Sequence, residues 1–321
     1  MPKSTINSTV KGKAYEFACI KALEKILKNV RPIEIVKNSS FEIARERYNE
    51  IHENEQKEMF ASAFSGIKVI IEMEPKIVED GKDKLTVLLQ PDNIAKSGDI
   101  RDVLIIRRSI EWEIGISVKH NHSALKHSRL STKLDFGNIW FGINCSDLYF
   151  KEIKPIFNKL LEDKEKGKLW EEIQNKYEII YKPLLKAFMK EFNSLYKMHN
   201  KNVTEKIILY LLGSNGKDYY KMIHNKNKTT RIQPFNLFGT LNQGTKNRKP
   251  SITYGKISLP TKIIDLSFKE NSQTTLILTM NNGWSISFRI HNASSRVEPS
   301  LKFDIQLVGQ PADIFYLDVS W

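Results

Sequence analysis

Two short apolar runs, separated by four residues, constrain the fold more than any other feature of the chain. Residues 102–107 (DVLIIR) and 112–119 (WEIGISVK) have strand length and are rich in β-branched and aromatic side chains. They predict two strands joined by a short turn. Residues 67–73 (IKVIIEM) and 85–90 (LTVLLQ) predict two further strands, and Pro91-Asp92-Asn93 predicts the turn that ends the second one.

Helical patterns lie on either side of these predicted strands. Residues 12–29 have apolar side chains at helical spacing, residues 41–64 form a polar stretch of good helix formers, and residues 122–131 also have a helical pattern. Strands mixed with helices in this way predict an α/β fold, with a mixed sheet flanked by helices.

The rest of the chain changes character twice. Residues 146–212 are dominated by long amphipathic patterns with many Lys–Glu pairs, which are typical of helices. Residues 252–321 carry short alternating runs, and Asn-Asn-Gly at 281–283 is a hairpin signal between two of them. We therefore expect an α/β region over residues 1–145, a helical region over 146–213 and an antiparallel β region over 214–321.

The charge of the chain bears on its partners. The sequence has 50 Lys and Arg against 37 Asp and Glu, a formal net charge of +13. A surplus of this size favours a polyanionic partner, although a merely soluble basic protein is the alternative. Residues 201–256 hold eleven of the basic residues and two acids, so this segment is a candidate DNA-facing region, with a solvated lysine-rich loop as the alternative.

The two cysteines and the N-terminus bear on the compartment. Cys19 and Cys145 cannot form a disulfide framework or a CxxC zinc site, and both lie among apolar residues. The first residues lack the apolar centre of a signal peptide, and no apolar run reaches the roughly 20 residues that span a bilayer. We expect a soluble, cytoplasmic protein with buried thiols.

The two strands predicted over residues 102–107 and 112–119 also carry a chemical pattern. Cleavage of a phosphodiester needs charge stabilisation on the phosphate and an activated water, which a carboxylate-bound metal ion and a lysine can supply. Asp102 begins one strand and Lys119 ends the next, and residues i and i+2 of a strand share a face about 6.5 Å apart. The set resembles the PD-(D/E)XK nuclease core, with Asp99 or Asp102 as the aspartate and Ser117 in the acid position.

A longer string is more specific. The segments GDIRDVLIIR, WEIGISVKHNHSALKHSRLS and NGWSISFRIHNASSRVEPSLKFDIQLVG resemble the HaeIII-type family of type II restriction endonucleases, over nearly the whole chain. The resemblance implies Mg²⁺-dependent cleavage of double-stranded DNA within the palindrome GGCC. A palindromic target implies two active sites related by two-fold symmetry, and hence a homodimer on DNA.

The catalytic candidates are therefore Asp102, Lys119, Glu113 and Ser117, and the metal candidates are Asp102, Asp99 and Glu113. Asp102 is preferred because it directly precedes a strand, whereas Asp99 could instead cap a turn. Glu113 lies about 20 Å from Lys119 along an extended strand, so it could join the same ion only through a bulge or bend. The second carboxylate could come from elsewhere, and the alternatives are Asp135, Glu72, Glu74 and Glu16.

Two further blocks are candidates for DNA contacts. The first follows Lys119, and its spacing does not fit the HNH nucleases, whose ligands are not consecutive. The second block lies around Arg289, and its arginines suit guanine N7 and O6, with phosphate contact as the alternative. The full set of DNA-binding candidates is His120, Asn121, His122, Lys126, His127, Arg129, Arg289, His291, Asn292 and Arg296.

Three functions compete at this point. A type II restriction endonuclease is favoured, with residues 1–145 as the PD-(D/E)XK-like catalytic core and residues 214–321 as the DNA-recognition region. A repair or structure-specific nuclease of the same core is the second reading, although it needs less sequence readout than the region after residue 200 offers. A non-catalytic DNA-binding protein is the third, because Ser117 stands where an acid is expected.

Overall fold

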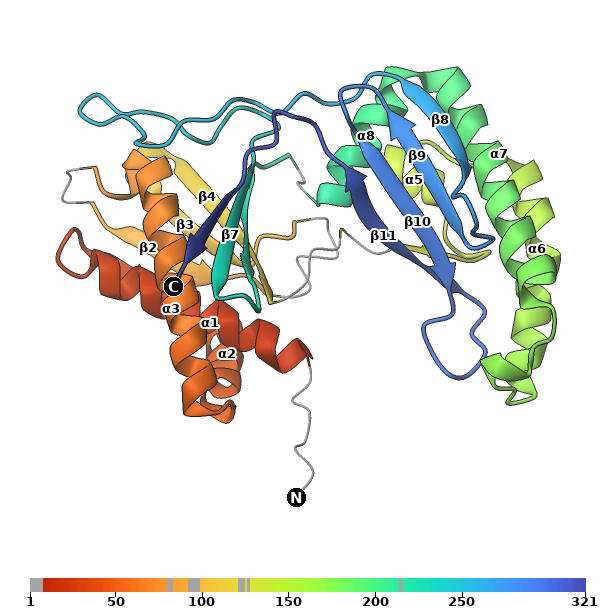
Figure 1. The fold of residues 1–321 in the computed structure, drawn as a ribbon, viewed down its shortest axis with the longest axis horizontal. Coiled ribbons are helices and arrows are strands. Elements are labelled where there is room, and N and C mark those ends of the chain that lie inside the picture. Colours follow the sequence, from red (N-terminus) through yellow and green to blue (C-terminus); the bar gives the residue numbers. More distant parts are fainter. Residues whose placement is uncertain (1–7, 80–82, 92–98, 121–124, 126–127, 214–215) are drawn as a thin grey trace. The chain divides into compact units, whose positions relative to one another are not determined.

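The computed structural model describes residues 8–79, 83–91, 99–120, 125, 128–213 and 216–321. The chain divides into two compact units (Figure 1). Unit 1 comprises residues 1–123, 213–257 and 313–321, and unit 2 comprises residues 124–212 and 258–312. Both units are thus assembled from segments that are distant in the sequence.

Unit 1 is built on a mixed sheet in the order β1-β2-β3-β4-β6-β7-β12. Its strands are β1 (Ile33–Ile35), β2 (Leu85–Leu89), β3 (Val103–Arg107), β4 (Trp112–His120), β6 (Tyr219–His224), β7 (Thr229–Phe235) and β12 (Leu317–Ser320). The β1–β2 and β4–β6 pairs are parallel, and the other neighbours are antiparallel. The strands predicted over residues 85–90, 102–107 and 112–119 are β2, β3 and β4, so the mixed sheet of the predicted α/β class is confirmed.

Three helices pack with this sheet: α1 (Ser8–Leu27), α2 (Ser39–Glu50) and α3 (Glu53–Met73). Figure 1 shows α1 and α3 lying across one face of the sheet, and their apolar sides join the strands in one core. The strand predicted over residues 67–73 is wrong, because these residues form the end of α3. Met59, Ala63, Ile67 and Ile70 are buried at helical spacing, and a short apolar run cannot reveal by itself whether it continues a helix.

Unit 2 contains an antiparallel sheet in the order β5-β11-β10-β9-β8. The strands are β5 (Ser128–Leu130), β8 (Ile263–Phe268), β9 (Thr275–Met280), β10 (Ser285–His291) and β11 (Leu301–Gly309). The helices are α5 (Phe136–Phe141), α6 (Asp147–Glu165), α7 (Lys182–His199) and α8 (Lys201–Leu212). The amphipathic segment 146–212 is therefore helical, as predicted.

Local chemistry accounts for several boundaries in unit 2. Ser146 caps α6 by accepting a hydrogen bond from the Tyr149 N–H, and Gly142 ends α5 in the left-handed region with φ 68°. The predicted Asn-Asn-Gly turn joins β9 to β10, and Asn282 and Gly283 take the positive φ values of 59° and 81° that such a turn needs.

Two other predictions need correction. Residues 128–130 of the predicted 122–131 helix form the strand β5, which pairs with β11; residues 121–124 and 126–127 lie outside the described residues. Residues 252–259, predicted as a strand, form none. The strand predicted at the C-terminus is β12, which pairs antiparallel with β7 in the mixed sheet of unit 1. A local pattern does not show whether a segment finds a pairing partner, which is why the assignments of residues 128–130 and 252–259 failed.

Candidate active site

Asp102, Ser117 and Lys119 come together at the edge where β3 begins and β4 ends. The Asp102 Oδ2 atom accepts a hydrogen bond from the Val118 N–H at 2.6 Å and lies 3.4 Å from Lys119 Nζ. The Ser117 Oγ atom donates to the same oxygen at 3.5 Å. The carboxylate thus takes a place in the β3–β4 ladder that a backbone carbonyl would otherwise fill. The side chains of Asp102 and Lys119 remain 24% and 30% exposed, so both can meet a ligand.

The two rival carboxylates lie on a different ion-pair cluster, centred on Arg101. Its guanidinium contacts Asp99 through Nε and Nη2, at 2.8 and 2.7 Å, and reaches Glu113 through Nη1 at 3.0 Å. Lys217 also contacts Glu113, at 3.1 Å. Burial opposes the shift, but the hydrogen bonds from Arg101 hold the pKa values of Asp99 and Glu113 below their ordinary range. Both carboxylates are thereby committed to Arg101 in this structure.

The other carboxylates considered from the sequence occupy unrelated environments. Glu16 is buried on α1 and pairs with Lys13 at 3.0 Å. Glu74 is fully buried after α3, where its Oε1 accepts from the Tyr220 hydroxyl at 2.6 Å, and burial raises the pKa of Glu74 to about 7. In unit 2, Asp135 caps α5 by accepting from the Asn138 N–H.

Glu72 was the last of these alternatives. It lies on α3 and is exposed, and its backbone carbonyl accepts from the Ser251 N–H at 2.9 Å. Glu16 is the alternative nearest to Asp102 in its effects, because burial first, and then the charges of Glu16 and Asp102, raise the pKa of the fully buried Cys19 thiol.

The parallel neighbour of β4 adds two residues that the sequence did not single out. His224 on β6 stacks on His120, with ring centroids 4.9 Å apart, and also stacks on Trp321 at 5.1 Å. Burial lowers the pKa of His224 to about 4, so this ring is neutral at physiological pH. Lys221 lies opposite Ser117 in the β4–β6 register and is 5% exposed. The signal for Lys221 was a lone lysine in an otherwise apolar run, YYKMI.

Unit 2 carries the remaining described DNA-binding candidates. Arg129 on β5 contacts Glu298 at 2.9 Å, and Arg289 on β10 lies 3.4 Å from Asp304 with 57% of its side chain exposed. His291 ends β10, and the Asn292 side chain donates to the Arg296 carbonyl at 2.7 Å, which fixes the loop after the strand. The four remaining candidates, Asn121, His122, Lys126 and His127, lie outside the described residues.

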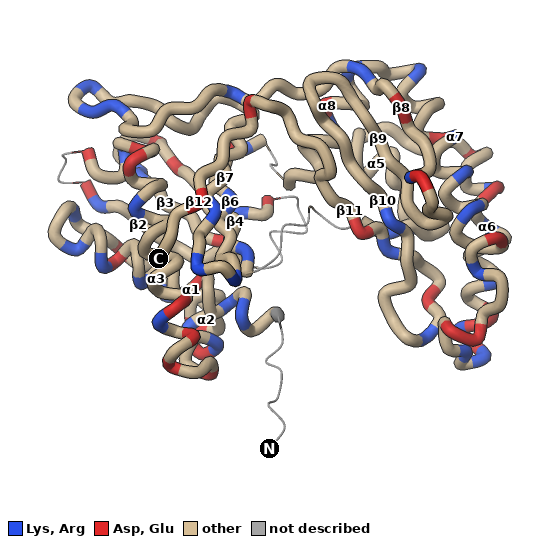
Figure 2. Tube along the Cα trace, in the orientation of Figure 1, with Lys and Arg blue, Asp and Glu red and all other residues tan. Residues whose placement is uncertain are grey.

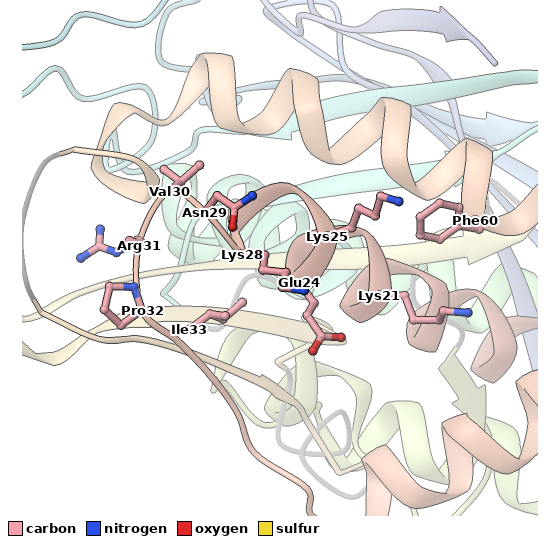
Figure 3. Close-up of a pocket in the computed structure, with 10 residues that line it drawn as sticks. All are labelled: Lys21, Glu24, Lys25, Lys28, Asn29, Val30, Arg31, Pro32, Ile33 and Phe60. Carbon is pink, nitrogen blue, oxygen red and sulfur yellow. The ribbon is translucent and has the colours of Figure 1, made fainter.

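Basic residues mark other parts of unit 1. Figure 2 shows them on the loop that follows β7, where the sequence has Lys246, Arg248 and Lys249. A surface pocket of about 940 Å³ lies beside α1, and its lining residues are drawn in Figure 3. It is lined by Lys21, Glu24, Lys25, Lys28, Asn29, Val30, Arg31, Pro32, Ile33 and Phe60. Asp102 and Lys119 do not line this pocket, which therefore does not coincide with the carboxylate–lysine site.

The fit of a metal ion rests on Asp102. No three His, Cys, Asp or Glu side chains gather into a ligand group among the residues that the structure describes. Mg²⁺ usually keeps several waters and takes one or two carboxylates together with substrate phosphates. A single half-buried carboxylate beside a lysine fits that mode of binding, with the phosphate as a further ligand.

The helices of the described segments include none that is long and apolar enough to cross a membrane.

Comparison with known proteins gives the class. The family model described as HaeIII restriction endonuclease matches residues 12–311. The Type II restriction enzyme HaeIII of Haemophilus aegyptius is 47% identical over 311 residues, which cover 97% of this chain and 97% of that enzyme. No solved structure gives a significant match. These matches place the protein among the restriction endonucleases, which are site-specific deoxyribonucleases. The chain belongs to the HaeIII restriction endonuclease family.

Proposed function

We propose that this endonuclease cleaves double-stranded DNA at the palindrome GGCC by Mg²⁺-dependent hydrolysis, with Asp102 and Lys119 at the centre of the reaction. The target and the metal come from the family resemblance. The observation that carries the site is the convergence of the Val118 N–H and Lys119 Nζ on one oxygen of Asp102. The β3–β4 arrangement supports a PD-(D/E)XK-type core with Ser117 in the acid position.

The residues divide the work as follows. Asp102 would hold the metal ion, which when bound supplies charge stabilisation on the phosphate and a more acidic water. The hydrogen bond from the Val118 N–H fixes the carboxylate, and its other oxygen, Oδ1, accepts no hydrogen bond that the structure describes. Lys119 is exposed enough to reach the scissile phosphate and the attacking water, where its ammonium stabilises developing negative charge. Ser117 is neutral and fully buried, so it supports Asp102 as a hydrogen-bond donor.

Asp99 and Glu113 are proposed as anchors for Arg101. To serve as metal ligands, as the sequence also allowed, they would have to exchange the guanidinium for the ion. For Asp99, whose pair with Arg101 is buried, breaking the pair leaves an uncompensated charge and costs about 3–5 kcal/mol. Arg101 lies two residues before β3, next to Asp102, so the cluster holds the segment that presents the proposed catalytic aspartate.

Sequence recognition is assigned to the β10 strand and the loop after it. Arg289 is exposed and held loosely by Asp304, so it can exchange that carboxylate for the N7 and O6 atoms of a guanine. Arg296 is exposed in the loop that Asn292 organises. His120, Arg129 and His291 are proposed as phosphate or water contacts. A palindromic target further supports action as a homodimer.

A plasmid cleavage assay tests the proposal. With Mg²⁺, the protein should give discrete fragments whose ends lie in GGCC, and chelation with EDTA should stop the reaction. Lys119→Ala should remove cleavage, whereas Lys84→Ala, which changes an exposed lysine directly before β2 that pairs with Glu34, should not. Heterogeneous nicking would favour a structure-specific nuclease, binding without cleavage would favour a non-catalytic protein, and full activity of Lys119→Ala would refute the proposed site.

A further inference from the structure

The turn between β6 and β7 presents two exposed lysines, Lys226 and Lys228. Residues 219–235, which form the two strands and the turn, contain no Asp or Glu. Asp318, on the neighbouring strand β12, is already paired with Arg231 at 2.7 Å. The turn therefore carries a local surplus of positive charge on the surface of unit 1.

Hydrogen bonds fix the backbone of this turn. The Asn225 N–H donates to the Thr229 carbonyl at 3.0 Å, and the Asn225 amide donates to the Thr229 hydroxyl oxygen at 3.2 Å. That hydroxyl donates in turn to the Asn227 side chain at 2.7 Å. Lys228 lies in the left-handed region with φ 56°, and its carbonyl accepts from the Trp321 N–H at 3.2 Å. Because the backbone is already ordered, a ligand has to immobilise only the lysine side chains, which lowers the entropic cost of binding.

The register of the sheet places the turn beside the candidate active site. β6 runs parallel to β4, and Lys119 is in register with Ile223, three residues before Lys226. With strands about 4.8 Å apart and a rise of about 3.3 Å per residue, the Cα atoms of Lys119 and Lys226 lie roughly 11 Å apart. The electrostatics agree with this position, because burial lowers the pKa of His120, and the charges of Lys11 and Lys226 add to that shift.

A second pair of exposed lysines, Lys246 and Lys249, belongs to the loop after β7 and lies at the opposite end of the sheet. β7 runs antiparallel to β6, and its last residue, Phe235, pairs with Tyr219, whose partner on β4 is Gly115. This end of the ladder is four residues, about 13 Å, from the catalytic lysine candidate on β4. The basic segment that the sequence indicates as DNA-facing thus has two ends, and only the β6–β7 turn lies beside the candidate active site.

We propose that Lys226 and Lys228 bind the DNA backbone beside the cleavage site, where they contact phosphates and read no bases. The proposal rests on the proposed function, since it takes Lys119 as the position of the scissile phosphate. The nucleotides of one strand are about 3.4 Å apart along the helix axis, so roughly 11 Å corresponds to about three nucleotides. Lys226 would therefore meet a phosphate about three nucleotides from the cut. Such contacts fix the position of the enzyme on the duplex and carry no sequence information.

The salt dependence of DNA binding tests the proposal. Binding is measured in EDTA, to prevent cleavage, on a duplex with one GGCC site and on a duplex of the same composition without it. Each phosphate contact contributes about 0.9 to the slope of log affinity against log salt concentration. The double variant Lys226→Gln with Lys228→Gln should therefore lose about 1.8 from the slope on both duplexes. It should weaken binding to both by the same factor, so that the preference for GGCC stays within about twofold of the parent's.

Two matched variants complete the experiment. Lys226→Arg with Lys228→Arg should keep the parent's slope, because arginine keeps the charge. Lys246→Gln with Lys249→Gln removes the same charge from the other end of the sheet and should also keep it. The proposal is overturned by an unchanged slope in the first double variant, by an equal loss of slope in the Lys246 and Lys249 control, or by a loss confined to the GGCC duplex.

Cleavage of the GGCC duplex by the parent protein with Mg²⁺ separates this proposal from the proposed function. If the parent cleaves within GGCC but Lys226→Gln with Lys228→Gln keeps its slope, only the role of the two lysines fails. If the parent neither cleaves nor prefers the GGCC duplex, the proposed function fails, whereas a slope reduced by about 1.8 in the double variant still supports the phosphate contacts.

Discussion

Replacing Lys221 with methionine should stabilise the protein at neutral pH. Methionine matches the unbranched shape of lysine and removes a buried charge. The pKa of Lys221 falls from 10.5 to about 8 on folding, and at 1.36 kcal/mol per unit this corresponds to a cost of about 3 kcal/mol. The cost is present in full below about pH 8 and disappears as pH rises to the unfolded value. We therefore expect Lys221→Met to gain up to about 3 kcal/mol at pH 7.

Urea unfolding of the two proteins at pH 7 and pH 10 measures this gain. The difference in free energy of unfolding should be largest at pH 7 and should shrink at pH 10, where the parent lysine is neutral in the folded state and largely released from its penalty. Lys84→Met, which removes an exposed charge, should show little difference at either pH. A methionine variant less stable than the parent at pH 7, or a gain independent of pH, would refute the reasoning.

Three further outcomes follow from other contacts. Glu74→Gln should raise stability at pH 8 by up to about 3 kcal/mol and by much less at pH 4.5, because burial raises the pKa of Glu74 to about 7 and its charged form is costly above that value; thermal melting at the two pH values checks this. Asp102→Asn can keep the hydrogen bond from Val118 but not the charge, so we expect at least about a 100-fold loss of cleavage with unchanged melting temperature. Gly115→Ala places a Cβ 2.2 Å from Arg101 Cδ, so the Arg101 side chain must be displaced. We expect the free energy of unfolding in urea titrations to fall by about 1–3 kcal/mol. An unchanged free energy of unfolding would show that Arg101 moves aside without cost.

The sequence predicts the strand pair β3–β4, because both strands are short, apolar and nearly adjacent in the chain. The expected proximity of Asp102 and Lys119 follows from that pairing, and the two side chains are in contact. Glu113 could not be resolved in the same way. Its alternation placed it on the face of Lys119, but its actual partner, Arg101, is set by the approach of that side chain to Gly115, which no periodicity encodes.

Long-range pairing accounts for the other misses. Lys221 and His224 join the site because β6 pairs in parallel with β4, and about a hundred residues separate the two strands in the chain. Parallel strands are joined by a long crossover connection, so the local sequence of a strand does not indicate its parallel partner. Residues 128–130 have a helical pattern in the sequence, but they form the strand β5 because they pair with the distant strand β11.

The division of the chain into two interleaved units has a consequence for how the enzyme could be altered. The backbone passes from one unit to the other four times, after residues 123, 212, 257 and 312. No single cut separates the units, and neither can be made from one uninterrupted stretch of sequence. The segments of the unit that holds Arg289 alternate in the sequence with those of the unit that holds Lys119. Target specificity therefore cannot be exchanged by replacing one terminal domain. If β10 and the loop after it read the sequence, as proposed above, new specificity would have to arise by substitutions within that strand and loop, with the rest of the chain unchanged.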